Sequence, residues 1–269
     1  MQTITPYDII EPKVQKIPIL VSVPHCGTNF PTNIKNDFKS TLIQSPDDTD
    51  WFVDKLYEFV LELGITIIRA KFSRWVIDLN RDPESKPLYD DGRIITSLTP
   101  TTTFLGESIY VKEFPDTEEI ENRKKLYYWP YYKQIDTILE ELEQQFGKVL
   151  LFDAHSIRQY VPSIYDDEFP DLVLGDNNEQ SANPELIYAA LNSLSNSRYS
   201  LQHNDPFKGG HITRYFGRPS QNRHALQLEM TKVNYMDDDE IKYDDNRAKK
   251  MQQVLTQMFI SLRDALDKI

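Results

Sequence analysis

Two histidines stand directly after strongly apolar runs of the sequence. His155 follows residues 149–152 with Asp153 beside it, and His25 follows residues 18–24. Four consecutive apolar residues predict a strand that is buried on both faces. In an open α/β sheet, ligands bind beyond the carboxyl ends of the strands. A histidine at such a place suits a metal ion or a proton better than packing, although each could also be an ordinary polar residue at a strand end.

A third ligand is needed if the two histidines hold a catalytic metal, because catalytic zinc keeps about three protein ligands and one open position for water. Both imidazoles can reach one ion if the two strands are neighbours. We expect a carboxylate as the third ligand, since no further histidine or cysteine is suitably placed. Asp50, at the head of the next predicted helix, is the first choice, with Asp48 and Asp54 as alternatives. Asp50 could instead only cap that helix.

Glu229 lies in the predicted strand 224–230, in which apolar residues alternate with Ala225, Gln227 and Glu229. A carboxylate that is partly desolvated beside a metal site can act as a general base. The alternative is an inward glutamate that is paired with an arginine.

Arginine side chains could bind an anionic substrate. Arg74 and Arg81 bracket the predicted strand residues 75–79, and Asn80 is next to Arg81. A planar guanidinium holds a carboxylate through two hydrogen bonds, which a lysine cannot do. The pair Asn80–Arg81 therefore predicts a site for a substrate carboxylate, and Arg214 is a further candidate. The alternative is a pair of solvated cations at a strand edge.

Four other residues could carry chemistry. His211 follows two glycines and either touches substrate or shapes a loop, whereas His203 and His224 are expected to be structural. Cys26 is adjacent to His25, but neighbouring residues at a strand end point to opposite sides, and catalytic Cys–His pairs normally come from distant positions. We therefore do not expect a cysteine nucleophile.

The net charge of -12 over 269 residues argues against nucleic acid as a partner, although it allows a small anionic substrate. The sequence has no apolar run long enough to span a membrane and no secretory signal. Its single cysteine excludes a disulfide framework and fits a reducing compartment. These features predict a cytoplasmic protein, and they leave its oligomeric state open.

Predicted strands and helices alternate along the chain, which indicates an α/β fold. The expected strands are 18–24, 65–70, 72–79, 149–152, 171–175 and 224–230, and the expected helices are 48–63, 117–146 with an interruption near residues 129–130, 184–194 and 243–268. Residues 83–108 have no periodicity, and we expect a loop that reaches over a site.

Seven segments, in order along the chain, together resemble the N-formylglutamate amidohydrolase family. They are VPHCGTNFP (23–31), DTDWFVDKLY (48–57), FSRWVIDLNRDP (72–83), FDAHS (152–156), DLVLGDNN (171–178), NDPFKGGHITRYFG (204–217) and HALQLEM (224–230). The family is similar to zinc carboxypeptidases and aspartoacylases. The resemblance implies that residues 1–269 form a single α/β domain with a mixed, largely parallel sheet flanked by helices.

The resemblance also implies roles for the candidate residues. It makes His25, Asp50 and His155 ligands of Zn²⁺ or another divalent metal, Asn80 and Arg81 the binders of a substrate carboxylate, and Glu229 the proton carrier. The implied reaction is hydrolysis of N-formyl-L-glutamate to formate and L-glutamate in histidine degradation, with Arg74 or Arg214 on the second carboxylate.

Two other functions remain open. A zinc deacylase or carboxypeptidase-like hydrolase for another N-acyl amino acid would keep the metal site and change the arginines. A non-catalytic binding protein on the same fold would have no use for a base at position 229.

Overall fold

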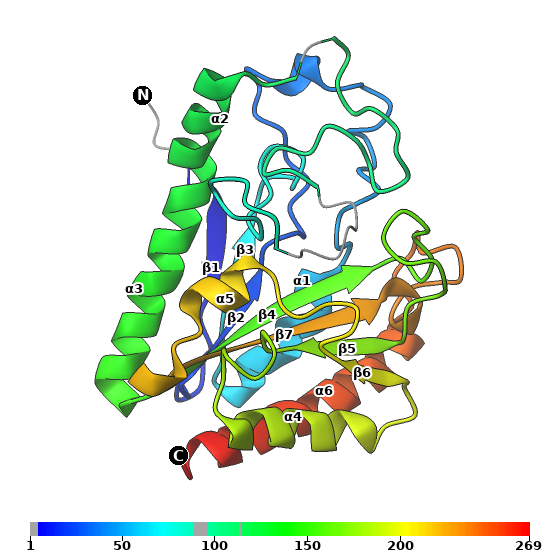
Figure 1. Ribbon diagram of the computed structural model, residues 1–269. Coiled ribbons are helices and arrows are strands. Elements are labelled where there is room, and N and C mark those ends of the chain that lie inside the picture. The colour runs from blue at the N-terminus through cyan, green and yellow to red at the C-terminus, as the bar shows by residue number, and fades with distance from the viewer. Residues whose placement is uncertain (1–4, 89–95, 113) are drawn as a thin grey trace.

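The computed structural model describes residues 5–88, 96–112 and 114–269. Its described strands form one mixed sheet in the order β1-β3-β2-β4-β7-β5-β6 (Figure 1). The strands are β1 (Tyr7–Ile10), β2 (Ile19–Val23), β3 (Thr66–Ala70), β4 (Val149–Ile157), β5 (Leu172–Gly175), β6 (Leu201–His203) and β7 (Arg223–Thr231). The predicted α/β class with a mixed sheet is confirmed.

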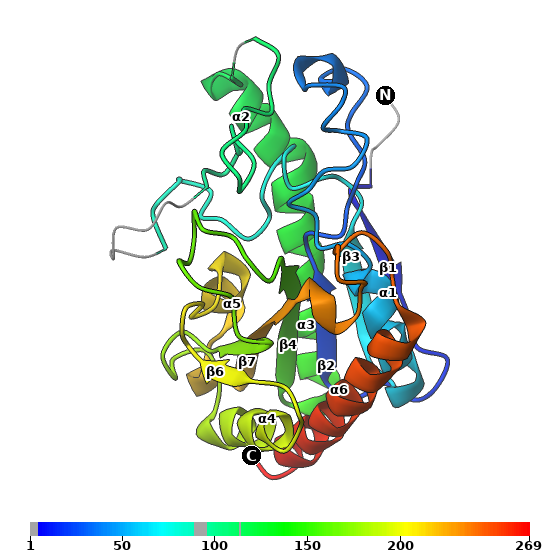
Figure 2. The same cartoon turned by 90° about the vertical axis from the view of Figure 1, so that its right-hand side faces the viewer.

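The centre of the sheet is parallel. β3, β2, β4 and β7 are neighbours that run in the same direction, whereas β1 is antiparallel to β3 and β5 is antiparallel to β7. The carboxyl ends of β2, β4 and β7 therefore meet at one edge of the sheet. Figure 2 shows the long connections of the first half of the chain gathered beyond this edge.

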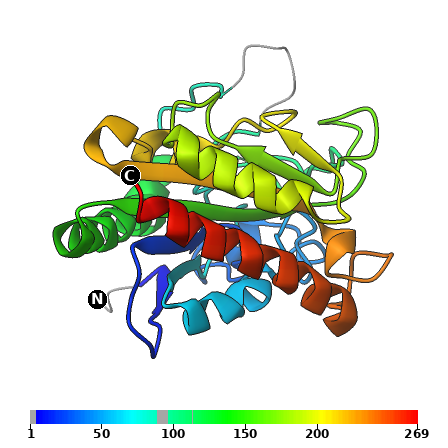
Figure 3. The same ribbon diagram turned by 90° about the horizontal axis from the view of Figure 1, so that it is seen from below.

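Helices cover both faces of the sheet. They are α1 (Val53–Tyr57), α2 (Thr117–Arg123), α3 (Trp129–Phe146), α4 (Pro184–Ser195), α5 (His211–Phe216) and α6 (Asp245–Leu266). Figure 3 shows α4 and α6 side by side beneath the sheet. Leu150 and Phe152 of β4 pack on that side, whereas Val149 and Leu151 pack against the side of α3 and α5. Burial on both faces explains why β4 is a continuous apolar run.

The helical prediction for residues 117–146 is confirmed, but residues 129–130, where the sequence predicts the interruption, are themselves helical, and the irregular turn lies just before them. A π-helical turn, Lys124–Tyr128, separates α2 from α3, and Pro130 lies in the first turn of α3, where its missing N–H is not needed. The predicted helices 184–194 and 243–268 correspond to α4 and α6. None of the helices in the described ranges has the length and apolarity that a membrane span requires.

Several local predictions are wrong. Residues 72–79 are not a strand but a series of turns, in which Val76 N–H bonds to the carbonyl of Ser73. The apolar side chains from Trp75 to Leu79 are buried, but the polar residues of the segment are buried as well, so alternation does not describe it. The short strands β1 and β6 were not expected.

The helix predicted from residue 48 begins only at Val53, after Phe52 in the left-handed region with φ of 63°, and it continues as a 3₁₀ helix from Glu58 to Leu63. Asp50 therefore does not cap it. Gly64 ends this helical segment with φ of 87°, in agreement with the expected end of the helix at residue 63.

Candidate metal and active site

The imidazoles of His25 and His155 lie next to each other at the carboxyl edge of the sheet. His155 is in β4, and His25 is two residues beyond the end of the neighbouring strand β2. Their ring centroids are 4.8 Å apart, and both side chains are buried. Parallel pairing of β2 with β4 thus brings together two histidines that are remote in the sequence.

Asp50 completes this group. Its Oδ2 atom is 3.3 Å from Nδ1 of His155 and 3.8 Å from Nδ1 of His25, and possible ligand atoms of the three residues all lie within 4.8 Å of one another. The two alternative carboxylates are engaged elsewhere. Asp48 accepts hydrogen bonds from Trp75 Nε1 and the Phe104 amide, and Asp54 pairs with Arg69.

The remaining imidazole nitrogens each face a second carboxylate. Nε2 of His25 is 2.7 Å from Asp78 Oδ1, and Nε2 of His155 is 2.8 Å from Asp153 Oδ2. A histidine that donates one N–H to a carboxylate presents the lone pair of its other nitrogen to a metal. Here both lone pairs would be on Nδ1, on the side of Asp50.

Buried charges decide the protonation of these residues. Burial and the nearby Arg74 lower the pKa of His25. Burial alone would raise the pKa of Asp78, but the guanidinium groups of Arg74 and Arg81 outweigh burial and hold that pKa well below its usual range. Burial alone would likewise lower the pKa of His155, but Asp153 and Asp50 outweigh it and raise the pKa. A cation bound at Nδ1 of His155 would therefore displace a proton.

The donor set fits a divalent cation such as zinc. Zinc binds histidine nitrogen and carboxylate oxygen at about 2 Å, so two donors on one ion lie roughly 3 to 4 Å apart. The distances from Asp50 Oδ2 to the two Nδ1 atoms fall in this range. In addition, Asp50 Oδ1 is buried and accepts no hydrogen bond from the described residues. An acceptor of this kind is costly unless a cation or water satisfies it.

Glu229 lies beside this group. It is the register partner of His155 in the parallel pair β4–β7, and its carboxyl group borders the same cavity. Burial raises the pKa of Glu229 to about 8, although the nearby His155 opposes this effect. A carboxyl group whose pKa lies near neutrality can both accept and return a proton.

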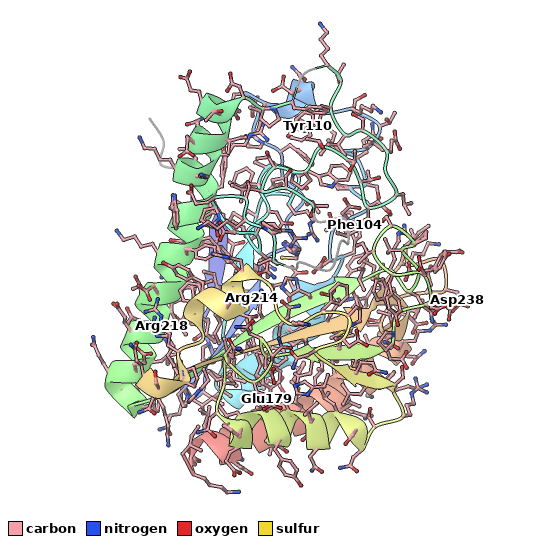
Figure 4. All side chains as sticks on the ribbon, viewed as in Figure 1. Phe104, Tyr110, Glu179, Arg214, Arg218 and Asp238 are labelled. Atoms are coloured by element: carbon pink, nitrogen blue, oxygen red, sulfur yellow. The ribbon has the colours of Figure 1, made fainter. Side chains whose placement is uncertain are left out.

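The cavity at this edge has a volume of about 190 Å³, which suits a small substrate. Its lining includes the three candidate ligands, Glu229 and the polar residues Arg74, Asn80, Arg81 and Gln227. It also includes four apolar residues that pack in one cluster, Phe104, Ile157, Ile164 and Phe207. Figure 4 labels Phe104, which lies over the strand ends. The ring of Phe104 is 4.8 Å from the Arg74 guanidinium carbon.

Asn80 is more deeply bound into the site than the sequence indicates. Its Oδ1 accepts the Ile212 N–H at 2.8 Å, and its Nδ2 lies 3.1 Å from Asp153 Oδ2 and 3.4 Å from Gln227 Oε1. Gln227 also accepts the Gly210 N–H at 2.7 Å. Asn80 and Gln227 thus connect Asp153, the partner of His155, to the turn before α5.

Arg74 and Arg81 both border the cavity. Arg74 Nη2 bonds to Asp78 Oδ2 at 2.6 Å, its Nη1 is 3.9 Å from Asp50 Oδ1, and its Nε has no hydrogen-bond partner among the described residues. Arg81 donates to the carbonyl and hydroxyl of Thr96 and to the carbonyl of Asn80. The guanidinium groups of Arg74 and Arg81 are therefore held in place by hydrogen bonds and ion pairs to other residues of the protein.

The other candidates lie away from this centre. Arg214, on α5 in Figure 4, donates to the carbonyls of Gly209 and Leu88 and is not part of the cavity lining given by the described residues. His203 pairs with Asp176 at 2.7 Å. Burial raises the pKa of the Cys26 thiol, which lies 3.5 Å from the carbonyl of Val23.

The loop predicted over residues 83–108 does border the cavity where it is described, through Leu88, Thr96 and residues 102–104 and 106. Residues 89–95 of this prediction lie outside the described residues. Several members of the site escaped the sequence analysis as contributors, among them Asp78, Gln227 and Phe104. Asp78 carried a signal, because a carboxylate inside an otherwise apolar run needs a partner.

Comparison with known proteins gives a consistent result. Residues 17–236 match the family described as N-formylglutamate amidohydrolase. Relatives named N-formylglutamate deformylase from Pseudomonas putida and Pseudomonas aeruginosa are 37% and 38% identical over 250 and 234 residues, which cover 92% and 86%, respectively, of both this chain and the relative.

Solved structures agree with these sequence matches. The N-formylglutamate amidohydrolase of Ralstonia eutropha JMP134 superposes with a TM-score of 0.80 at 25% identity, covering 97% of this chain and 98% of that one. The gene product Atu2144 of Agrobacterium tumefaciens shares the fold, with a TM-score of 0.74 at 17% identity over 96% of this chain and 95% of that one. The family match includes every residue that lines the cavity, and this chain belongs to the N-formylglutamate amidohydrolase family.

Proposed function

We propose that this protein hydrolyses N-formyl-L-glutamate to formate and L-glutamate, with a divalent metal, zinc as first choice, held by His25, Asp50 and His155. The observation that carries the proposal is the place of Glu229, opposite His155 in the strand register and on the cavity that the three candidate ligands share. Its relatives from two Pseudomonas species carry the name of this activity.

The metal would lower the pKa of a water molecule and polarise the formyl carbonyl. Glu229 accepts the proton of the attacking water as the new C–O bond forms at the formyl carbon. It then returns this proton to the amide nitrogen as the C–N bond breaks, so that formate and the free amine of glutamate leave. Burial of the Glu229 carboxyl group favours the first of these two transfers, because a desolvated carboxylate is a stronger base than an exposed one.

The substrate would be held through its two carboxylates. Arg81, with Asn80 beside it, binds one carboxylate, and Arg74 binds the other, since the two arginines border the cavity. A substrate without the carboxylate that Arg74 binds would leave the buried Nε of Arg74 without an acceptor, and such losses are costly. Arg214 would act indirectly, because it holds the Gly209 carbonyl and the Leu88 carbonyl.

The proposal places the protein in histidine breakdown in the cytoplasm, which fits its charge and its single cysteine. The second candidate is hydrolysis of another N-acyl amino acid on the same metal and base. The apolar residues Phe104, Ile157 and Phe207 line the cavity and support this candidate, because they would favour contact with a longer acyl group or an apolar side chain.

The test is formate release by protein that has been stripped of metal with a chelator and then supplied with zinc. N-formyl-L-glutamate is compared with N-formyl-L-glutamine, which lacks one carboxylate, and with N-acetyl-L-glutamate. We expect activity to return with about one zinc per chain and kcat/KM to be highest for N-formyl-L-glutamate. Full activity without metal would contradict the metal centre, and a higher kcat/KM for the acetyl compound would favour the second candidate.

A further inference from the structure

The segment that carries Asp50 has no regular secondary structure of its own. Residues 46–52, which include Asp50, form turns. The Asp50 N–H donates to the His25 carbonyl at 3.0 Å, which connects this segment to the edge of the sheet. Its Oδ2 accepts the Ser156 N–H at 3.0 Å. A carboxylate on an irregular segment needs further support to stay within reach of two histidines.

Arg158 supplies this support from the end of β4. It is three residues beyond His155, and it binds Asp47, which is three residues before Asp50. Arg158 Nε lies 3.0 and 3.1 Å from the two carboxylate oxygens of Asp47, and its Nη2 also contacts Asp47. The end of β4 and the segment 46–52 are thus joined at two points. His155 and Ser156 contact the Asp50 carboxylate, and Arg158 binds the Asp47 carboxylate.

Two further charged residues fix the position of Arg158 and Asp47. Glu240 accepts from Arg158 Nη1 at 3.0 Å and from the Gln159 N–H at 2.7 Å. Lys232, just beyond β7, donates to the Asp47 carbonyl at 3.2 Å. The side chain of Glu240 is 8% exposed and that of Arg158 is 29% exposed, so their ion pair is partly shielded from solvent.

We propose that Arg158 is a positioning residue for the metal centre, which acts through Asp47 to hold Asp50 facing His25 and His155. The inference rests on the proposed metal role of these three residues. Loss of Arg158 would free the Asp47 side chain, and among the described residues it would leave the Gln159 N–H as the donor to the Glu240 carboxylate. Asp50 would then sample positions away from the two imidazoles.

The experiment measures zinc affinity by competition with a chromophoric chelator in the full-length protein. The variants are Arg158→Gln, Arg158→Lys, which keeps the charge but not the planar fork, and the control Arg223→Gln. Arg223 also binds one carboxylate through two nitrogens, on Glu143, and pairs with Asp136, but it lies at the opposite end of β7 from Glu229.

We expect Arg158→Gln to weaken zinc binding by about 10- to 100-fold, as for other residues that support metal ligands. Arg158→Lys should lie between it and the wild type, and Arg223→Gln should bind zinc like the wild type. Excess zinc should restore most of kcat in Arg158→Gln. If this variant does not fold, Asp47→Asn makes the same test, because it weakens the interaction between Arg158 and residue 47 from the carboxylate side.

The outcomes separate the two proposals. Unchanged zinc affinity in Arg158→Gln, with a wild type that binds zinc, would overturn only the positioning role. An equal loss of affinity in Arg223→Gln would also overturn it, since the effect would then be one of general stability. A wild type that binds no zinc would overturn the metal centre and, with it, this inference.

Discussion

Glu229 of β7 lies directly opposite His155 of β4, two positions beyond the pair Gln227 and Asp153. The preceding pair on this face, Leu151 and Ala225, is apolar and belongs to the core on the side of α3 and α5. Along β4 and β7, the same face of the sheet thus contributes first to the hydrophobic core and then to the candidate active site. Because regular strands carry these residues, the candidate ligand and the candidate base are held at a fixed separation.

The first prediction concerns Glu229→Gln. The amide has nearly the shape of the carboxyl group but cannot accept a proton, so kcat for formate release should fall by about 10²- to 10⁴-fold. Zinc content and the thermal midpoint should change little, because Gln keeps nearly the same shape and volume at this half-buried position. Undiminished formate release in this variant would remove Glu229 from the mechanism.

The second prediction concerns the pH dependence of kcat/KM. Glu229 must be ionised to accept a proton, and burial raises its pKa to about 8 before any cation is bound. A metal on His155 and Asp50 favours the carboxylate and lowers this pKa. The rate should therefore rise with pH along an ascending limb whose apparent pKa is at or below about 8. A rate that falls with rising pH over the same range would contradict a basic role for Glu229.

The third prediction concerns Asp78→Asn. Asp78 is fully buried and holds His25 Nε2, so an anion at this place keeps the lone pair of His25 on Nδ1. An asparagine removes the charge and can donate to Nε2, which would move the imidazole proton to Nδ1. Zinc affinity should drop by about 10- to 100-fold.

Asp48→Asn is the matched control for Asp78→Asn. Asp48 is also buried, but it bonds to Trp75 and the Phe104 amide rather than to a histidine. This variant should retain zinc affinity even if its stability falls. Equal affinity losses in the two variants would show that Asp78 has no special relation to His25.

The fold and the candidate ligands could be predicted because each rests on a local pattern. Buried parallel strands produce apolar runs, and polar residues directly after such runs can only lie at the sheet edge, as His25 and His155 do. The choice of Asp50 over Asp48 could not be made from spacing, since it depends on turns at residues 46–52 and on the αL conformation of Phe52.

The segment 72–79 shows a second limit. Its apolar residues are buried as expected of a strand, but Asp78 and Arg74 are buried with them and pair with each other. Burial of a paired charge depends on tertiary structure, which periodicity does not record. For the same reason, the sequence predicted Asn80 as a substrate contact and did not reveal its bonds to Ile212 and Asp153.

The fourth prediction concerns Gly210→Ala. A Cβ atom at Gly210 would lie 2.3 Å from Asn80 Nδ2, so either Asn80 or the turn must move. Such a shift disturbs the bonds from Asn80 to Asp153 and from Gly210 to Gln227. Displacement of a site by about 1 Å can cost 10²-fold in rate, so kcat/KM should fall by roughly one to two orders of magnitude.

The control for Gly210→Ala is Gly147→Ala. Gly147 has φ of 78° at the end of α3, and a Cβ there meets no atom within 4 Å. Its replacement should lower stability by about 1 kcal/mol through backbone strain and leave kcat/KM unchanged. If Gly210→Ala behaves in the same way, the contact with Asn80 does not matter for catalysis.

The fifth prediction concerns His224 and the acid stability of the fold. His224 is buried, neither of its ring nitrogens has a hydrogen-bond partner among the described residues, and burial together with Lys148 lowers its pKa to about 4. In the unfolded chain the His224 imidazole binds a proton near pH 6.5, whereas in the folded chain it does so only near pH 4. The free energy of unfolding should therefore fall as pH falls through this window, by up to about 3 kcal/mol from this residue.

Urea unfolding at several pH values measures this effect. The free energy of unfolding should fall less with acid in His224→Leu than in the wild type. The control is His203→Gln, at a histidine that is paired with Asp176. Equal acid losses in His224→Leu and the wild type would show that His224 does not set this dependence.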